Sequence, residues 1–320
     1  MKRPLRSRSG SLIDVISRGI RFLLKHGPKK TIERTLLELY RMRGRPFADH
    51  DGAGGESSGR RQYSFDSDIY RQWSEKFEPD DRVLLEQHEI ARTFRLKPLI
   101  SLVTPVFNPD VTVFAGMIGS VMDQTYDNWE LCLADASTNA EIGELIRQSE
   151  EKNPQRLRVK RLDRNLGIAG NSNEALKLAT GDFVALLDHD DVIAPWALFD
   201  IAKCVNDNPQ ADCIFSDRDI LFPGGMRAHP FFKPGWSPDL LMSQNYLCHI
   251  AVFRRELIET LGGFRAGFDG AQDYDLFLRA TEATRNVIHI PRILYHWRVV
   301  QGSASVDHDA KPYAYDAAQK

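Results

Sequence analysis

Three aspartates crowd into the short stretch LLDHDD, residues 186–191, where Asp188, Asp190 and Asp191 surround a histidine. The residues before them are apolar, which predicts a buried strand that ends in a cluster of negative charge. Such carboxylates repel each other and resist desolvation. Mg²⁺ and Mn²⁺ take oxygen ligands and leave positions for phosphate oxygens. The spacing therefore favours a metal–diphosphate site over the alternative, an acidic turn capping a helix that begins near Pro195, for which one aspartate would suffice.

The elements that must position these acids alternate between strand and helix from Leu99 onward. Apolar runs predict strands at 99–103, 129–135, 156–162 and 182–188, and helical spacing fills the intervals at 114–124, 139–153 and 169–180. Such alternation predicts an α/β fold with a parallel sheet covered on both faces, in which ligands bind beyond the carboxyl ends of the strands. Polar residues stand at three of those ends, in 104–108, 135–139 and 188–191. After about residue 212 the alternation loosens into an α+β region.

The charge of the 320-residue chain is unevenly distributed. The net charge is −2, yet residues 1–48 hold thirteen Lys/Arg and three Asp/Glu, so the rest of the chain is acidic. The basic end predicts a surface-binding arm, and the acidic body argues against nucleic acid as a ligand. The four cysteines have no metal-like spacing, and there is no signal-peptide core or long uncharged apolar run. We therefore expect reduced thiols and a cytoplasmic protein.

The segments outside the alternating region carry their own expectations. Residues 11–43 have the periodicity of two amphipathic helices divided by HGPKK at 26–30, so we expect residues 1–48 to form a basic helical segment. Such a segment suits a peripheral position on the anionic inner face of a membrane, or docking on the catalytic body or a partner subunit, and both alternatives stay open. Residues 49–97 predict a Gly/Ser-rich linker and a helical lead-in. Residues 306–320 begin a helix that is cut off, as in a longer chain.

Six motifs follow one another in an order that resembles the family 2 glycosyltransferases with the GT-A fold. They are VTPVFN (103–108), LADAST (133–138), RNLGIAGNSNEAL (164–176), GDFVALLDHDDVI (181–193), GGFRAGFDGAQDYDLFLR (262–279) and LYHWR (294–298). The resemblance covers about residues 98–305, and its variant is similar to the enzymes that build bacterial O-antigen and capsular polysaccharides. It implies a Rossmann-like, mostly parallel sheet flanked by helices. It also implies inverting transfer of a sugar from a nucleotide-diphosphate donor to a saccharide acceptor, which in such pathways is lipid-linked.

The resemblance further implies which residues hold the donor and the metal. Asp135 matches the acid that binds the base, although Ala134 replaces the other acid of the usual pair. Asp188 and Asp190 match the Asp-X-Asp motif, and Asp191 extends it. The implied donor-binding residues are Thr104, Pro105, Phe107, Asp135, Arg164, Asn165, Gly167, Asn171, Asp188, Asp190 and Arg298. The implied ligands of a Mn²⁺ or Mg²⁺ cofactor are Asp190, Asp191 and His296.

The stretch AQDYD, residues 271–275, matches the motif whose aspartate is the general base of inverting enzymes. Asp273 is therefore the implied catalytic base, with Gln272 in place of the usual glutamate. Asp273 is also compatible with a helix N-cap, and Asp275 ranks second because a side chain two residues along a helix points elsewhere. Segment 229–249 is rich in aromatics and proline, so it is either the acceptor site or a buried connection. The acceptor candidates are Lys233, Trp236, Asn245, Tyr246 and Gln272.

Two other functions compete with this interpretation. A sugar-phosphate nucleotidyltransferase would carry a basic, Gly-rich loop after the first strand, whereas TPVFNPD has neither glycine nor a basic residue. A non-catalytic sugar-binding or scaffold module would have no need of the intact aspartates. The resemblance therefore implies an enzyme, a metal-dependent inverting glycosyltransferase of bacterial surface polysaccharide biosynthesis.

Overall fold

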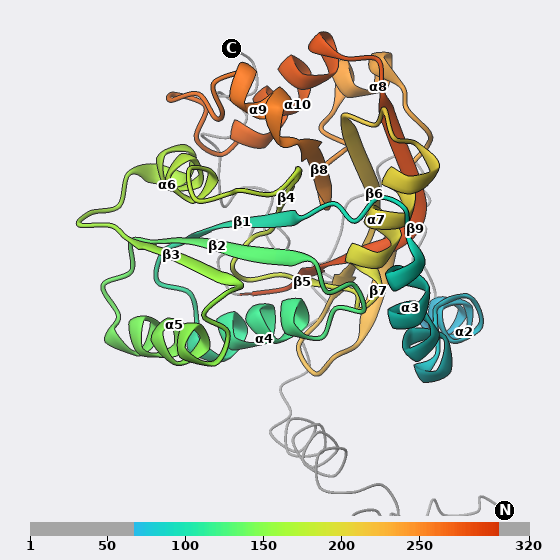
Figure 1. Cartoon of the computed structure of the whole chain (residues 1–320), viewed down its shortest axis with the longest axis horizontal. Helices are drawn as coiled ribbons and strands as arrows, with labels where there is room; N and C mark the ends of the chain where they lie inside the picture. Colours follow the sequence, from blue (N-terminus) through green and yellow to red (C-terminus); the bar gives the residue numbers. More distant parts are fainter. Residues whose placement is uncertain (1–66, 301–320) are drawn as a thin grey trace, which may run out of the picture. The chain divides into compact units, whose positions relative to one another are not determined.

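The computed structural model describes residues 67–300 (Figure 1). The predictions for residues 1–48, for the linker that begins at residue 49 and for residues 306–320 lie outside the described residues. The described part of the predicted lead-in forms two helices, α2 (Ser67–Phe77) and α3 (Asp81–Thr93). Within the described range, no helix combines the length and the apolar character needed to cross a lipid bilayer.

Four parallel strands form one half of the sheet. Their order is β3 (Leu157–Arg161), β2 (Trp129–Asp135), β1 (Ile100–Val106) and β4 (Phe183–Leu186). The crossover helices between them are α4 (Val111–Met122), α5 (Ala140–Lys152) and α6 (Gly167–Leu176). The alternation of strand and helix predicted this half of the fold, because each helical crossover returns the chain to start another parallel strand.

Both faces of β1, β2 and β4 are buried, whereas β3 at the edge of the sheet is largely exposed. Leu102 and Leu131, which are cross-strand partners, belong to the core cluster shared with α4 and α5. Val103 and Cys132, the next pair along, belong to the cluster shared with α6. Successive residues of a strand point to opposite faces, so strands covered on both sides must be apolar throughout. Figure 1 shows the same layers, with α4 and α5 on one side of the strands and α6 on the other.

The second half of the sheet is mixed. It continues from β4 through β8 (Ala251–Arg254), β6 (Cys213–Leu221), β9 (Val287–Arg298) and β5 (Val192–Ile193), and β7 (Arg227–Phe231) pairs with β6. The pairs β4–β8, β6–β8, β6–β7 and β5–β9 are antiparallel, and β6–β9 is parallel. The α/β class is confirmed, but the sheet as a whole is mixed and not mostly parallel. Its second half lacks regular helical crossovers, and long-range pairing sets the strand directions there.

The remaining helices flank this second half. They are α7 (Ala197–Asp207), α8 (Pro238–Ser243), α9 (Arg255–Thr260) and α10 (Gln272–Ala283).

Helix α2 is tied to the sheet by a buried polar network. The Tyr70 hydroxyl donates to Asp219 at 2.7 Å, and Arg227 bridges Asp219 and Glu78. Because each of these groups is paired, the lead-in helix is an integral part of the folded body.

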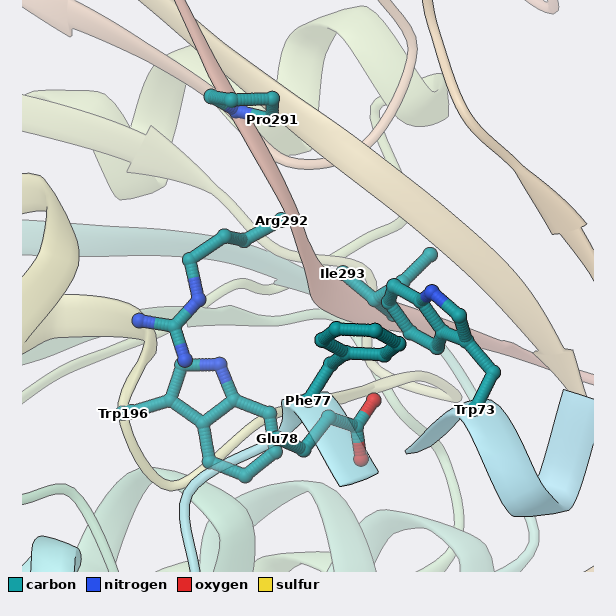
Figure 2. Close-up of a pocket in the computed structure, with 7 residues that line it drawn as sticks. All are labelled: Trp73, Phe77, Glu78, Trp196, Pro291, Arg292 and Ile293. Atoms are coloured by element: carbon teal, nitrogen blue, oxygen red, sulfur yellow. The ribbon is translucent and has the colours of Figure 1, made fainter. Parts of the chain in front are cut away.

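A pocket of about 230 Å³ lies where α2 approaches β9 (Figure 2). It is lined by Trp73, Phe77, Glu78, Trp196, Pro291, Arg292 and Ile293. Its two charged side chains are already engaged, Glu78 with Arg227 and Arg292 with Asp200. None of the lining residues is a predicted site residue, so the site must be sought at the strand ends.

Candidate active site

The loops that follow β1 and β2 are joined through Asn108. Its backbone N–H donates to the Ser137 hydroxyl at 2.9 Å, and its Oδ1 accepts from the N–H groups of Thr138 and Asn139 at 2.8 and 3.2 Å. Asn108 has a φ of 45°, in the left-handed region that asparagine tolerates better than most residues. These bonds fix one wall of the predicted donor site.

Asp135, the last residue of β2, is buried at this wall. Its Oδ1 accepts from the N–H of Ser137 at 2.8 Å, and its other oxygen is paired with Arg161 of β3. Arg161 also donates to the Ser137 carbonyl at 2.6 Å. The carboxylate that we expect to bind the base is therefore held in one orientation. Sequence reasoning missed Arg161, because only the β2–β3 register brings it beside Asp135.

The end of β1 lies against the LLDHDD stretch. Thr104 is buried, and its hydroxyl has no hydrogen-bond partner among residues 67–300. The Pro105 carbonyl lies 2.9 Å from Nδ1 of His189. The side chain of Phe107 is 42% exposed, so it is accessible to a ligand. The structure thus brings the first predicted donor loop to the aspartates.

The segment that opens α6 is shaped by two asparagines. The Asn165 side-chain oxygen accepts from the N–H of Gly167 at 3.0 Å and from the Asn171 amide at 2.9 Å. Asn171 in turn accepts from the N–H of Leu166 at 3.0 Å. Gly167 has a φ of 79°, which glycine adopts without a steric penalty. The asparagines therefore hold the loop in shape, and the exposed Arg164 at its start reaches into solvent.

Asp269 reaches the same helix from the loop before α10. Its Oδ1 accepts from the backbone N–H of Ala169 at 3.0 Å, in the first turn of α6. A carboxylate is favourable at a helix N-terminus. The contact joins the donor side of the site to the segment that carries the predicted base. No sequence signal indicated it, since the two residues are 100 positions apart.

Asp191 is the most buried of the three aspartates in LLDHDD. It is buried, with one oxygen 2.6 Å from the Tyr295 hydroxyl and the other 2.7 Å from the backbone N–H of Arg298, both of which donate to it. Burial, followed by the negative charges of Asp190 and Asp188, raises its pKa well above the ordinary aspartate value. The predicted repulsion within the cluster is therefore present in the folded chain.

A histidine that sequence reasoning missed completes this cluster. His249 offers a ring nitrogen, and Asp188 and Asp191 each offer a carboxylate oxygen, with all three atoms within 4.8 Å of one another. Burial, then the positive charges of Arg218 and Lys233, lowers the pKa of His249 to about 3. A neutral imidazole with two carboxylates suits Mn²⁺ or a similar divalent cation. The donor set therefore fits a metal.

His296 has a different neighbour from the expected one. It is buried, and its Nδ1 lies 2.6 Å from Oδ1 of Asp219, which also binds Tyr70 and Arg227. The preceding residue, Tyr295, is the one that contacts Asp191. Neighbouring residues of a strand point to opposite faces, so β9 directs Tyr295 to the aspartates and His296 away from them. The structure does not bring His296 to the cluster.

Asp273 lies in the first turn of α10. Its Oδ2 accepts from the Asn245 side-chain amide at 2.9 Å, and burial raises its pKa. The N-cap of α10 is Ala271, so the alternative role of Asp273 as the cap does not hold. Asn245 was an acceptor candidate, and the structure does bring it to the predicted base. A carboxylate with a raised pKa is suited to taking a proton.

Asp275 is engaged elsewhere. It is buried between Arg265 and Arg279, to which its two oxygens are bonded. Burial alone would raise the pKa of Asp275, but the hydrogen bonds from these two guanidiniums outweigh it and hold the pKa below its ordinary value. Arg279 also donates to the carbonyls of Leu261 and Gly263, so Asp275 anchors α10 to the turn after α9.

Replacing Asp275 by asparagine should therefore destabilise the fold, by roughly 2–4 kcal/mol at neutral pH, because it leaves two guanidiniums without their carboxylate. The folded-state pKa is depressed, so the stabilisation is fully present above the unfolded value of about 3.9 and is lost as the pH falls through the folded value. Urea unfolding of wild type and variant at several pH values measures this. A stability difference that stays constant from pH 7 to pH 3 would contradict the role.

The acceptor candidates of segment 229–249 divide into two groups. Lys233 is buried and donates to the carbonyls of Leu247, Cys248 and His249 at 3.1, 2.7 and 2.8 Å. Burial lowers its pKa to about 7. The Tyr246 hydroxyl accepts from the N–H of Ser237 at 2.8 Å. These contacts support the backbone on which His249 stands.

The remaining acceptor candidates lie in the segment of the predicted base or against the hydrophobic core. Gln272 accepts from the N–H of Gly270 at 2.8 Å, and Trp236 is half-buried against the core cluster that includes Tyr246. Arg298, a donor candidate, donates from its guanidinium to the Val113 carbonyl at 2.7 Å. Of the acceptor set, Asn245 has the most direct contact with the predicted chemistry.

Comparisons with known proteins agree with this geometry. The family model described as Glycosyl transferase family 2 matches residues 101–262. The O-antigen biosynthesis protein RfbC of Myxococcus xanthus is 41% identical over 237 residues, which are 74% of this chain and 18% of that protein. The chain spans about a quarter or less of the length of the first curated relatives that it matches.

Solved structures show the same fold. S. aureus TarS 1–349 in complex with UDP-GlcNAc aligns with a TM-score of 0.54 and 20% identity, over 65% of this chain and 60% of the other. The mannosyltransferase PcManGT from Pyrobaculum calidifontis, in complex with GDP-Man and Mn²⁺, aligns with a TM-score of 0.52 and 19% identity, over 73% and 69%. With a matching family model over half its length and this fold, the chain belongs to the family 2 glycosyltransferases.

Proposed function

We propose that the chain is a metal-dependent, inverting glycosyltransferase that moves a sugar from a nucleoside-diphosphate donor to a saccharide acceptor. The observation that carries the proposal is that the aspartates fall into two groups. Asp188 and Asp191 form a cluster with His249, while Asp273 stands apart at α10 with a raised pKa. Complexes of structural relatives with UDP-GlcNAc and with GDP-Man and Mn²⁺ support this assignment.

The Asp188–Asp191–His249 set would hold the cation, which when bound supplies positive charge to the departing diphosphate. This cluster differs from the set inferred from sequence at two positions, with Asp188 in place of Asp190 and His249 in place of His296. Asp190, half-buried beside the cluster, keeps its proposed role toward the donor. Asp135, oriented by Arg161, would accept a hydrogen bond from the nucleotide base.

In the proposed reaction Asp273 takes the proton of an acceptor hydroxyl. The acceptor oxygen forms its bond to the anomeric carbon from the side opposite the diphosphate, whose bond to that carbon breaks as an electron pair leaves with it. The configuration at carbon is inverted. Asn245 holds the Asp273 carboxylate in place for this step, which a positioned general base requires.

The similarity to an O-antigen biosynthesis protein supports a polysaccharide acceptor, and a lipid-linked one is our proposal. Residues 11–43 lie outside the described residues, so their contact with a membrane and their docking on protein both stay predictions.

The function is tested by donor hydrolysis. The full chain is incubated with UDP-, GDP-, dTDP- and CDP-sugars in Mn²⁺, in Mg²⁺ or in EDTA, and released nucleoside diphosphate is measured. We expect slow release from one donor class with metal only. A scaffold module would release none. A nucleotidyltransferase would instead release pyrophosphate from a nucleoside triphosphate and a sugar phosphate.

The proposal that His249, and not His296, binds the metal gives a separate prediction. His249→Ala should raise the Mn²⁺ concentration needed for half-maximal activity by about 10–100-fold, as loss of a contact to a metal site does. His296→Ala should leave that concentration unchanged and lower stability, because Asp219 loses a buried partner. Metal titrations and thermal unfolding of both variants separate the roles. The reverse pattern would restore His296 as the ligand.

A further inference from the structure

Arg218 differs from the other arginines near the candidate active site. It lies in β6 opposite Tyr295 of β9, and it is half-buried. Its guanidinium carbon lies over the ring of Trp297, 4.6 Å from the ring centroid, and 5.5 Å from the centroid of Phe231. Aromatic faces attract a guanidinium and restrict its plane, so the two rings hold the group in place.

The polar edge of Arg218 lacks a protein partner. Its guanidinium makes no hydrogen bond or ion pair with residues 67–300, and none of its nitrogens is among the buried atoms sealed from solvent. By contrast, Arg227 is bonded to Glu78 and Asp219. Removing a charged group from water without a hydrogen-bonded partner is unfavourable. An open guanidinium edge in a half-buried position therefore favours an anionic ligand.

The surroundings of Arg218 connect it to the candidate active site. Tyr295, its cross-strand partner, donates to Asp191, and the ring of His249 stacks on Tyr295 at 4.8 Å. The same His249 ring lies 6.0 Å from Trp297, which carries the guanidinium of Arg218. One continuous set of rings therefore links the guanidinium to the proposed metal cluster.

A purely structural role for Arg218 explains less. An aromatic or aliphatic side chain would fill the space between Phe231 and Trp297 without removing a charge from water. A lysine would carry the charge but would lack the planar fork of N–H donors that matches a carboxylate or phosphate. The arrangement retains both the charge and the fork, and no residue among 67–300 forms a hydrogen bond or ion pair with the fork, although the carboxylates of Asp191 and Asp219 lie near enough to act on its charge.

We propose that Arg218 binds an oxyanion of a substrate at this site, either a phosphate of the nucleotide donor or a phosphate or carboxylate of an acidic acceptor. The inference rests on the proposed function and adds an anion-specific contact to the same site. Both sources share the chemistry that a guanidinium recognises, and direct binding measurements distinguish them.

The experiment compares the full-length wild type with Arg218→Met and Arg218→Lys. Arg285→Met, which removes the same charge from an exposed position, serves as the matched control. Calorimetry with Mn²⁺ measures the affinities for UDP, GDP, dTDP and CDP, and then for inorganic phosphate and glucuronate with the tightest diphosphate saturating. Thermal unfolding tests whether each variant is folded.

A donor phosphate predicts that Arg218→Met weakens nucleoside diphosphate binding by about tenfold or more, the loss expected for a hydrogen bond to a charged group. An acidic acceptor predicts unchanged diphosphate binding and a similar loss for phosphate or glucuronate. In either case Arg218→Lys should recover part of the affinity and Arg285→Met should match the wild type.

Equal affinities of wild type, Arg218→Lys and Arg218→Met for every anion would overturn the inference. If Arg218→Met does not fold, the comparison rests on Arg218→Lys, which keeps the charge and loses the fork. A wild-type chain that binds no nucleoside diphosphate would instead refute the proposed function. In that case phosphate and glucuronate are titrated without a diphosphate, and a loss of their binding in the variants would still support anion binding by Arg218.

Discussion

Replacing Asp273 by asparagine is expected to lower the rate of sugar transfer by about 10²–10⁴-fold, the usual effect of losing a positioned general base. Asparagine has nearly the same shape, and its side-chain oxygen can still accept the hydrogen bond from Asn245. The variant should therefore fold and bind nucleoside diphosphate as the wild type does. Transfer assays, calorimetry and thermal unfolding measure the three quantities separately.

The pH dependence of the wild type gives a second readout of the same residue. The base must be ionised to act, and burial raises the pKa of Asp273. Activity should therefore increase with pH through a value above the ordinary aspartate pKa of about 3.9, and Asp273→Asn should lack this limb. If Asp273→Asn kept most of its transfer rate while folded Asp275→Asn lost it, the base would be Asp275.

The local pattern of the sequence was enough to predict the first half of the fold. Between Leu99 and Leu187 the strands and helices alternate at short spacing, and β1, β2 and β4 are buried on both faces, whereas the edge strand β3 is largely exposed. After residue 212 direction and register depend on pairing between distant segments, such as β6 with β9. No local pattern specifies such pairing, so the sequence predicted an α+β region there but not its strand order or directions.

The residues of the candidate site also divide into those that the sequence indicated and those that only the structure shows. Asp188 and Asp191 follow a strand, and their spacing alone suggested chemistry, whereas the family resemblance of AQDYD indicated Asp273. His249 lies more than fifty residues after Asp191 in a segment with no metal-like spacing, and Lys233 donates to three backbone carbonyls in that segment. Its role depends on tertiary contacts that the sequence does not display.

The two histidines illustrate how strand geometry limits prediction. Tyr295 and His296 are adjacent, and β9 sends one side chain to Asp191 and the other to Asp219. A shift of one residue in the pairing of β9 would exchange the two faces. The motif LYHWR cannot specify that register, so only the structure separates a residue that contacts the cluster from one that does not.

Asp191→Asn is expected to change activity and stability in opposite directions. The carboxylate is buried beside two others, and its pKa is raised, so its ionised form destabilises the metal-free fold. An asparagine removes this repulsion. Its oxygen can accept from the N–H of Arg298, and its amide can donate to the Tyr295 hydroxyl. We expect a rise of about 2–4 °C in the metal-free unfolding midpoint at neutral pH, which corresponds to roughly 1 kcal/mol in a domain of this size.

The same substitution removes a proposed metal ligand and a unit of negative charge. Transfer supported by Mn²⁺ should therefore fall by about 10²–10³-fold, the loss seen when one group that stabilises transition-state charge is removed. The increase in unfolding midpoint that Mn²⁺ gives the wild type should also shrink, because a ligand stabilises a fold in proportion to its binding. Asp123→Asn, the same charge change at the exposed C-cap of α4, is the control and should retain wild-type activity and metal response. A folded Asp191→Asn protein with wild-type turnover, or one that is less stable than the wild type without metal, would show that Asp191 serves the fold and not the cation.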